Sequence, residues 1–442
     1  MTQDSAPLSQ QTPSATLTCE VVVIGGGIAG LTQTVALAKA GVATVCIDPG
    51  PPRIASEAAP PDALDGRTTA LLQGSLNVLS ACGVDDPRAL ANTLGGEALS
   101  VMRIVDESGR PAGHPVTATF EAAESGPGNE SGAGASPFGY NVPNATLRAR
   151  LLEILAGLEN GTHLAPARLH GLDLRGDRAV ATLEDGRRIH ARLAIGADGK
   201  NAPSREAAGI RVRRWGYGQR AMAFSIAHER PHGQVSTEFH REGGPFVLVP
   251  LPGNRSSVVW VDRARAVAAF HALDTAAFRD LVQDRTRGIL GRVGEVGPRG
   301  SYTVETLIAD RYAGPRLALI GEAAHALPPI GAQGLNLGLT DVATLTEMVV
   351  AALCEGRDPG AASVLSRYER ARRPDVIARV HAIDTLNRLV MTRLPPVKAL
   401  RHLGLRAAGR VGPLRTALMT LGMTPVGGTP ALMRGEALPH VT

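Results

Sequence analysis

Residues 20–48 read EVVVIGGGIAGLTQTVALAKAGVATVCID, and this stretch decides the first layer of the fold. The run VVVI is short, β-branched and apolar, which is typical of a buried parallel strand. GGGIAG (residues 25–30) follows it directly and fits the pattern GxGxxG. The next ten residues have helical character, and ATVCI then predicts a second strand that ends at Asp48. Strand, glycine turn, helix, strand and terminal acid in this order predict a dinucleotide-binding unit.

Each part of this unit has a physical role. Gly25 makes the tight turn, Gly27 lets the backbone approach a pyrophosphate, and Gly30 lets helix and strand pack closely. The unpaired N–H groups at the helix start face the phosphates. Asp48 can accept the hydroxyls of an unphosphorylated ribose, which favours FAD or NAD over NADP. The alternative is a glycine-rich turn that binds nothing.

Composition excludes several classes of protein. With 44% hydrophobic and 20% charged residues the chain is globular, and no apolar run reaches the roughly 18 residues of a membrane span. Its four cysteines form no CxxC, so we expect neither a disulfide framework nor a metal site. Fourteen aromatic residues among 442 argue against a base-stacking surface, and we expect no nucleic-acid partner.

The net charge of +5 is unevenly distributed. Residues 361–424 hold 12 Lys and Arg against three acids, which gives +9 there and −4 in the rest of the chain. Apolar residues at helical spacing from Val376 to Leu394 predict an amphipathic helix, and later leucines predict two short ones. These helices either dock on their own domain or lie on an anionic membrane surface. Residues 1–17 are polar and indicate a disordered tail, and residues 121–137 indicate a low-complexity loop.

Two later segments repeat the combination of strand, glycine and acid. LAIGADG (residues 193–199) places Asp198 at the carboxyl end of a strand. LALIGEAAHALPPIGAQGLNLG (residues 317–338) predicts a strand, a rigid loop and a helix whose first N–H groups can bond the N1/O2 edge of a reduced flavin. Glu322 is placed to accept hydrogen bonds from the ribityl hydroxyls of a flavin. His325 is either a catalytic base or, as we favour, a structural residue. Ligands scattered so widely along the chain suit FAD better than NAD.

In their order and separation these three motifs resemble the single-component (class A) flavin-dependent aromatic hydroxylases. Further stretches resemble the UbiH-like hydroxylases of ubiquinone biosynthesis, and the resemblance covers residues 19–424. The stretches that carry this second resemblance are DGRTTAL (65–71), FGYNVPN (138–144), YERARRPD (368–375) and DTLNRL (384–389).

The resemblance implies an α/β fold. It consists of a Rossmann-like FAD-binding domain of the p-hydroxybenzoate hydroxylase type, an inserted mainly β substrate domain and a helical C-terminus. The expected division is a tail at 1–17, the FAD-binding domain at 18–90, 140–205 and 300–360, the substrate domain at 91–139 and 206–299, and a basic helical region at 361–442.

The resemblance also implies site residues. Arg67 would lie against the flavin and pyrophosphate, and Asn144 and Arg148 begin a helix that contacts FAD in this class. Glu322 stands where the class usually has Asp, one methylene shorter. The sequence identifies no catalytic base. The expected cofactor-binding residues are Gly25, Gly27, Ile28, Ala29, Gly30, Asp48, Arg67, Asn144, Arg148, Asp198, Gly321, Glu322, Ala332, Gln333, Gly334, Leu335 and Asn336.

The reaction implied is a monooxygenation. NAD(P)H would bind transiently and reduce FAD, O2 would give the flavin C4a-hydroperoxide, and one oxygen atom would pass to the ring of a polyprenylated phenol. Two alternatives stay open: hydroxylation of a soluble aromatic compound, and a non-catalytic subunit of a quinone-biosynthesis complex. A flavin halogenase is disfavoured because the only tryptophans, Trp215 and Trp260, cannot form WxWxIP. We expect a cytoplasmic protein, peripheral on the inner face of a bacterial plasma membrane through 361–424, with a place in such a complex.

Overall fold

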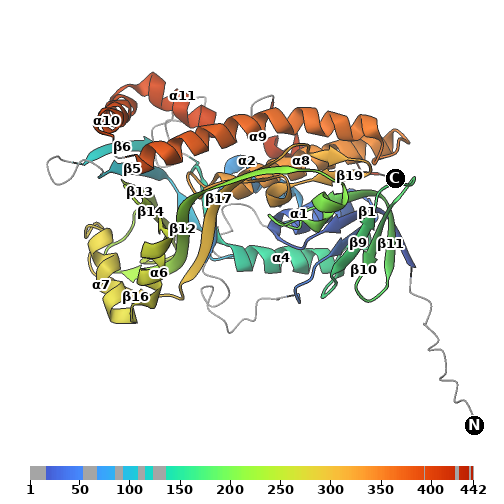
Figure 1. Cartoon of the computed structure of the whole chain (residues 1–442), viewed down its shortest axis with the longest axis horizontal. Helices are drawn as coiled ribbons and strands as arrows, with labels where there is room; N and C mark the ends of the chain where they lie inside the picture. The colour runs from blue at the N-terminus through green and yellow to red at the C-terminus, as the bar shows by residue number, and fades with distance from the viewer. Residues whose placement is uncertain are drawn as a thin grey trace, which may run out of the picture.

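The computed structural model describes residues 16–52, 67–84, 93–107, 115–122, 136–392, 394–423, 428–437 and 440–441. The expected tail at 1–17 and loop at 121–137 lie almost wholly outside the described residues, as does the start of the 65–71 motif. Two large sheets lie side by side, and helices cover them (Figure 1).

The first sheet contains the dinucleotide-binding unit. Its parallel core has the order β19-β11-β1-β2-β8, so the two strands predicted around the glycine turn are neighbours at its centre. An antiparallel meander and a short edge strand extend it. The strands are β1 (Thr16–Ile24), β2 (Thr44–Ile47), β8 (Gly161–Leu164), β9 (Leu169–Asp173), β10 (Ala179–Leu183), β11 (Arg188–Gly196), β18 (Ala313–Gly314) and β19 (Leu317–Leu319).

The second sheet has nine strands in the order β20-β17-β12-β15-β14-β13-β5-β6, with β16 paired to β12. Its strands are β5 (Val101–Asp106), β6 (Val116–Glu121), β12 (Val212–His228), β13 (Val235–Arg241), β14 (Gly244–Leu251), β15 (Arg255–Arg263), β16 (Val293–Val296), β17 (Gly300–Ala309) and β20 (His325–Ala326). A small third sheet joins β3 (Thr68–Leu72), β7 (Gly139–Pro143) and β4 (Glu97–Leu99).

Some of the helices are those predicted from the sequence, among them the helix after the glycine turn and the helix that contains Val376, whereas α2, α6 and α7 were not predicted. The first eight are α1 (Ile28–Lys39), α2 (Gln73–Ala81), α4 (Asn144–Ala156), α5 (Pro203–Ala207), α6 (Ala264–Ala272), α7 (Thr275–Arg285), α8 (Gln333–Cys354) and α9 (Ala362–Met391). The last two are α10 (Pro395–Arg410) and α11 (Gly412–Met423), and short 3-10 turns form at Gly321–Ala323 and Leu432–Arg434. Pro395 opens α10 at a position that needs no backbone N–H, which explains the break after α9.

The expected fold class is confirmed. The second sheet packs one face against α6 and α7 through a separate aromatic core that includes Phe224, Phe246, Trp260 and Phe278. The predicted helix from Val376 onward is the second half of α9, which buries Val376, Val380, Ile383 and Val390 but leaves Leu386 exposed. The domain boundaries stay a prediction.

The end of the chain returns to the first sheet. The backbone N–H of Leu432 donates to Glu347 on α8 at 2.9 Å, and Asn77 on α2 donates to the carbonyl of Met433 at 2.8 Å. The N–H of Val441 donates to the carbonyl of Ala40 at 2.8 Å. The described residues after 427 therefore pack with the glycine-turn unit, apart from the basic helices that precede them.

Within the described part of the chain, α8 is the one helix long and apolar enough to cross a membrane, and 72% of its most apolar window is buried inside the protein. This burial fits a core helix. Three of the four cysteines, Cys19, Cys46 and Cys82, are also buried, and burial raises the pKa of each thiol to about 12. They act as small apolar side chains, as expected, whereas Cys354 is exposed.

Candidate functional site

The glycine turn between β1 and α1 is shaped by close backbone contacts. Gly25 has a φ of +110°, and a Cβ there would stand 2.4 Å from the carbonyl oxygen of Ala197. A Cβ on Gly30 would stand 1.9 Å from the carbonyl oxygen of Gly25. Gly27 is different, because among the described residues nothing lies within 4 Å of its Cβ position. Gly25 and Gly30 thus serve packing, whereas Gly27 leaves an open approach to the backbone.

Asp48 closes this turn from the end of β2. Its Oδ2 accepts a hydrogen bond from an Arg148 terminal nitrogen at 3.0 Å, and its Oδ1 accepts one from the N–H of Gly50 at 2.7 Å. Arg148 also donates from Nε to the carbonyl of Gly26 at 2.9 Å. A Cβ on Gly26 would stand 2.1 Å from Asp48 Oδ2. The structure therefore brings Asp48, Arg148 and the glycine turn together, although they are far apart in sequence.

The helix that follows the turn begins without a side-chain cap. No described side chain accepts a capping hydrogen bond at the start of α1, where Ile28 and Ala29 form the first turn. The same holds for α8, whose N-cap is Ala332. Uncapped helix starts leave N–H groups and a partial positive charge that suit phosphates or an anionic ring edge.

The loop before α8 is held in an unusual conformation. Gly331 and Ala332 both have positive φ, 61° and 53°, and Ala332 is one of four non-glycine residues with positive φ in the described chain. Asn336 fixes this turn by donating to the carbonyls of Ala70 and Ala332 at 2.9 and 2.7 Å. Its Oδ1 also accepts from Leu72 and Ser75. The Asn336 amide is fully used by the protein, so it positions the loop.

The other loop residues have distinct surroundings. Gln333 accepts a hydrogen bond from Arg379 on α9 at 3.2 Å, which ties the start of α8 to that helix. A Cβ on Gly334 would meet nothing within 4 Å among the described residues, so the first turn of α8 is open there, with Leu335 next to it half-buried. Gly321 has a φ of +56° and lies against α1, where a Cβ on Gly321 would stand 3.6 Å from the Cβ of Ala29.

Asp198 has a different environment from the one expected of a ligand-facing acid. Its Oδ2 accepts from the N–H of Ser204 at 2.9 Å, and its Oδ1 accepts from the Ser204 hydroxyl at 2.8 Å. Burial raises the pKa of this carboxyl above its usual value. In the structure Asp198 holds the short helix α5 behind the glycine turn, and its predicted contact with cofactors stays a prediction.

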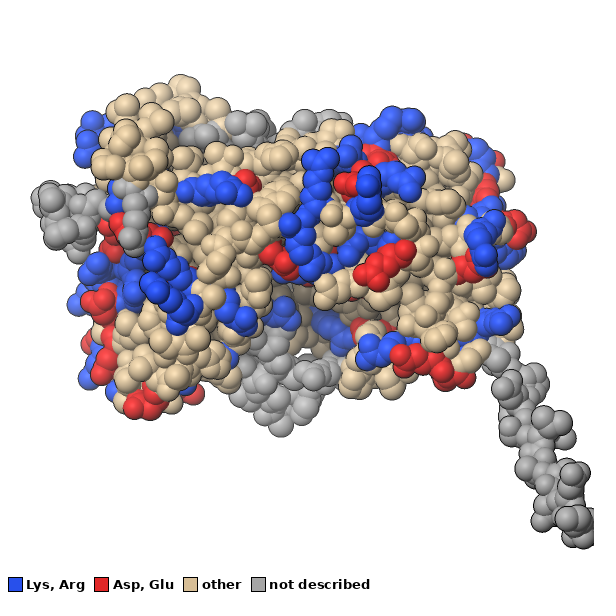
Figure 2. Space-filling model, viewed as in Figure 1, with Lys and Arg blue, Asp and Glu red and all other residues tan. Residues whose placement is uncertain are grey.

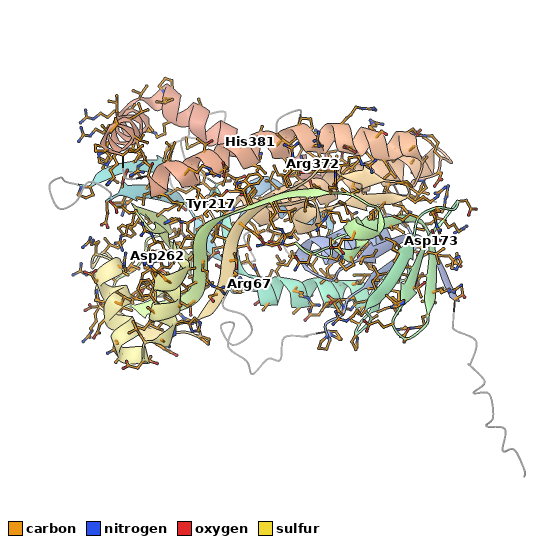
Figure 3. All side chains as sticks on the ribbon, viewed as in Figure 1. Arg67, Asp173, Tyr217, Asp262, Arg372 and His381 are labelled. Atoms are coloured by element: carbon orange, nitrogen blue, oxygen red, sulfur yellow. The ribbon has the colours of Figure 1, made fainter. Side chains whose placement is uncertain are left out.

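Arg67, Asn144 and Glu322 lie where the sheets meet. The N–H of Asn144 donates to the carbonyl of Arg67 at 3.0 Å, and its Oδ1 accepts from Thr69 at 2.7 Å. Figure 3 places Arg67 near the start of α4, beside β12 and β17. Burial raises the pKa of Tyr302 on β17 to about 12, and the charges of Arg67 and Glu322 both act on it. Tyr302 therefore shares their neighbourhood, and only its place in a strand could have been predicted from the sequence.

A buried ionic network connects α8 and α9 next to the loop that precedes α8. Asp341 on α8 accepts from His325 Nε2 at 2.7 Å, from Arg372 Nε at 2.8 Å and from the N–H of Gly321 at 3.0 Å. Arg372 also pairs with Asp375 at 2.9 Å. Burial would raise the pKa of Asp341, but His325 and Arg372 lower it below its usual value. His325 is thus a structural partner of Asp341, as favoured from the sequence.

The DTLNRL stretch (384–389) fastens α9 to the second sheet. Asp384 Oδ1 accepts from Trp215 Nε1 at 2.8 Å and from the Tyr217 hydroxyl at 2.6 Å. Asn387 donates to Gln219 at 3.1 Å. All three partners lie on β12, the long strand that extends from beside the first sheet into the second (Figures 1 and 3).

The face of the second sheet opposite α6 and α7 is lined by small apolar side chains and two tyrosines. They form a cluster of Ala221, Val259, Val261, Val304, Tyr217 and Tyr302. Ser257 is on the same face of β15, and its hydroxyl accepts from Thr68 at 2.9 Å. Thr68 follows Arg67, so this face is turned toward the predicted flavin side.

The residues present fit FAD. Gly27 is open where a pyrophosphate would approach, two uncapped helix starts face the site, and Asp48 stands at the ribose position of the motif. Within the described residues no group of three or more His, Cys, Asp or Glu could hold a metal ion.

Comparison with known proteins gives the same picture. The model of a family described as FAD binding domain matches residues 18–382. Ubiquinone hydroxylase UbiL of Rhodospirillum rubrum is 40% identical over 432 residues, which is 97% of this chain and 95% of that protein. The 3-demethoxyubiquinol 3-hydroxylase of Escherichia coli is 30% identical over 400 residues, 90% of this chain and 96% of that protein.

Solved structures share the fold at low sequence identity. The p-nitrophenol 4-monooxygenase PnpA of Pseudomonas putida superposes with a TM-score of 0.72 at 21% identity, covering 93% of this chain and 100% of that one. PqsL of Pseudomonas aeruginosa, described as a probable FAD-dependent monooxygenase, gives 0.67 at 20% identity over 88% of this chain and 99% of its own.

Proposed function

This chain belongs to the UbiH-like family of FAD-dependent hydroxylases, and from this membership we propose that it hydroxylates the aromatic ring of a polyprenylated phenol in ubiquinone biosynthesis. The observation that carries the proposal is the 40% identity to a ubiquinone hydroxylase over 97% of the chain. The enzyme is an FAD-dependent monooxygenase, and NAD(P)H and O2 are its co-substrates.

Bound FAD, once reduced, supplies activated oxygen for transfer to a ring carbon. The chain's own residues have three tasks. Gly27 and the uncapped start of α1 would hold the phosphates, and Asp48, held by Arg148, would accept the ribose hydroxyls. The loop at Gly331 and Ala332, fixed by Asn336, orients the ring. The apolar sheet face beside Arg67 excludes water.

The same apolar face supports the substrate class. Ala221, Val259 and Val261 offer small side chains next to Tyr302, which suits a phenol with a hydrocarbon chain. The proposal extends to location and partners. A polyprenylated phenol resides in the bilayer, so the enzyme works peripherally at the inner face of a bacterial plasma membrane, and it belongs to a quinone-biosynthesis complex.

The test compares two substrates on the purified, FAD-loaded protein. We expect NAD(P)H oxidation that depends on a short-chain prenylated phenol, and a product that carries one oxygen atom from isotopically labelled O2. Equal or better kcat/KM for 4-hydroxybenzoate would instead support the soluble-aromatic alternative. A yellow protein whose NAD(P)H oxidation responds to neither phenol would support the non-catalytic subunit.

A deletion strain provides the cellular readout. Loss of the gene should cause accumulation of a quinone precursor that lacks one ring hydroxyl, detected by mass spectrometry, and the wild-type gene should remove it. Normal quinone in the deletion strain would contradict the proposal. The mass and fragmentation of the precursor identify the ring position.

A further inference from the structure

We propose that the outer face of α10 and the start of α11 is a docking surface for an anionic lipid bilayer. Seven large hydrophobic side chains are exposed among the described residues, and six of them lie between residues 386 and 414. The most exposed are Leu394, Leu400 and Leu403, at 61%, 68% and 65%. Val411, which follows α10, and Leu414 on α11 continue the patch.

Helix α10 differs from an ordinary surface helix, which turns its apolar side inward, because Leu400 and Leu403 are exposed. Its inward side is charged: Arg401 pairs with Asp106 at the end of β5 through bonds of 2.5 and 3.2 Å. Both side chains are buried, with 6% and 0% of their surface exposed. Lys398 pairs with Glu242 at 2.9 Å. These ion pairs hold the helix with Leu400 and Leu403 exposed to solvent.

The contact with β6 fixes the same orientation. Ala408 is the one buried residue among the described residues of α10, and a Cβ on the next residue, Gly409, would stand 3.5 Å from the carbonyl oxygen of Thr117. At about 100° per residue, Leu403, Arg406 and Arg410 lie on the side opposite Ala408. Arg406 and Arg410 are not buried. The outward stripe of α10 is therefore leucine flanked by arginine.

The charge of the segment around this surface indicates which partner would bind to it. From residue 385 to 435 the sequence contains no Asp or Glu, and it contains eight Lys or Arg. The corner formed by α10 and α11 in Figure 2 is largely tan with blue at its edge. A second copy docked symmetrically on the same acid-free patch would bring Lys and Arg side chains near one another, and like charges repel. An anionic lipid surface accepts both the leucines and the arginines.

The surface lies next to the substrate sheet, because α10 packs on β6, the edge strand of that sheet, and on its neighbour β5. A bilayer bound there is adjacent to the domain that receives the phenol. The use of this contact for a polyprenylated substrate rests on the proposed function. The lipid contact itself rests on the exposed leucines, the ion pairs behind them and the acid-free segment.

The experiment measures co-sedimentation of the full-length holoenzyme with vesicles. One set contains equal parts of phosphatidylcholine and phosphatidylglycerol, and the other contains phosphatidylcholine alone. We expect binding to the anionic vesicles that weakens with salt. The double variant Leu400→Ser/Leu403→Ser should lose at least about tenfold in partition coefficient. Ile289→Ser, at an exposed hydrophobic residue 39% exposed and outside the patch, is the matched control and should bind like the wild type.

A second variant tests the charges. Arg406→Gln/Arg410→Gln should weaken binding to anionic vesicles about tenfold and leave binding to neutral vesicles unchanged. Wild-type binding by the leucine double variant would overturn the proposal. The proposal would also be overturned if the wild type bound no vesicles but formed a dimer that the leucine double variant dissociates. That result would support an interface between two copies of the chain.

The activity assay separates this proposal from the proposed function. A protein that hydroxylates a short-chain phenol but ignores vesicles contradicts only the docking surface. A protein that binds vesicles through Leu400 and Leu403 but hydroxylates no phenol contradicts only the reaction. Both surface variants should retain the short-chain activity, because their side chains lie on the outer side of α10.

Discussion

At the scale of single residues, the three glycines of the first turn have separable roles. Gly25 and Gly30 admit no Cβ because backbone atoms stand within 2.4 Å of it, whereas Gly27 has free space. Gly27 also has extended backbone angles, φ −71° and ψ 176°, which alanine adopts without strain. Among the described residues the space at Gly27 is therefore open for the predicted ligand, and a methyl group there should not disturb the packing of the chain.

We expect Gly27→Ala to weaken FAD binding about tenfold or more, because the methyl group occupies the pyrophosphate approach. The stability of the apoprotein should change by less than about 1 kcal/mol. Fluorescence titration of the apoprotein with FAD measures the first, and urea unfolding measures the second. Gly171→Ala, on β9 with nothing described within 4 Å, is the control. Unchanged FAD affinity would contradict this role of Gly27.

The sequence predicted residue roles where the partners are local. The glycine turn and Asp48 belong to one motif of fewer than about thirty residues, and the structure brings them together. Asn336 and Asp198 show where prediction from local sequence stops. The partners of Asn336 include Ser75, 261 positions away, and no pattern in the chain marks that pairing. The sequence pattern places Asp198 at the end of a strand, but it does not show that Ser204 donates to both its oxygens, and the contact of Asp198 with a cofactor stays a prediction.

At the scale of elements, helix α9 connects to both sheets. Its middle carries Arg372 in the buried network under the α8 loop, and its end carries Asp384 against β12. Local patterning predicted the helix from its apolar spacing. It could not predict these contacts, because Trp215 and Asp384 are 169 positions apart. The same holds for helix α10. Its apolar spacing alone allowed it either to dock on its own domain or to lie on a membrane surface.

We expect Arg372→Met to cost about 3–5 kcal/mol in the free energy of unfolding, since it leaves Asp341 and Asp375 buried without their shared partner. Arg370→Met, at an exposed position on the same helix, should cost less than about 0.5 kcal/mol. Urea unfolding followed by tryptophan fluorescence measures both. Similar losses in the two variants would show that the network contributes nothing specific.

The same variant has a pH signature. The pKa of Asp341 is lower in the folded wild type than in the unfolded chain, so its stabilisation is complete above the unfolded pKa of about 4. It is lost as the pH falls through the folded value. Without Arg372 the folded pKa rises, and acid unfolding of Arg372→Met should begin at a higher pH than that of the wild type. An unchanged acid midpoint would contradict the assignment.

At the scale of the whole molecule, the predicted flavin site is assembled from distant segments that both sheets help to hold. Helix α9 joins these parts, because it is bonded to α8 through Arg372 and to β12 through Asp384. The family's fold class was predictable because the motifs are specific. The return of residues 428–437 to α2 and α8 could not be predicted, because that segment has neither periodicity nor a motif.

We expect the holoenzyme to release flavin and unfold in one transition, because loss of either sheet removes part of the site. Flavin fluorescence and far-UV circular dichroism should give the same midpoint on heating. Excess FAD at about 100 times its Kd should stabilise the protein by about 2.7 kcal/mol. FMN lacks the adenosine that Asp48 would receive, so it should stabilise less. Flavin release well below the unfolding midpoint would contradict this coupling.

The order of strands in the first sheet has a consequence for synthesis. β1 is made first, yet its parallel neighbour β11 begins at Arg188, and the turn at Gly331 comes later still in a chain of 442 residues. β1 can therefore pair early with β2, whereas its other edge stays unpaired until β11 has been made. Pairings of such long range form slowly. A newly made chain can therefore bind flavin only late in its synthesis. A chain whose synthesis stops before α8 contains the glycine turn but lacks the loop expected to hold the flavin ring.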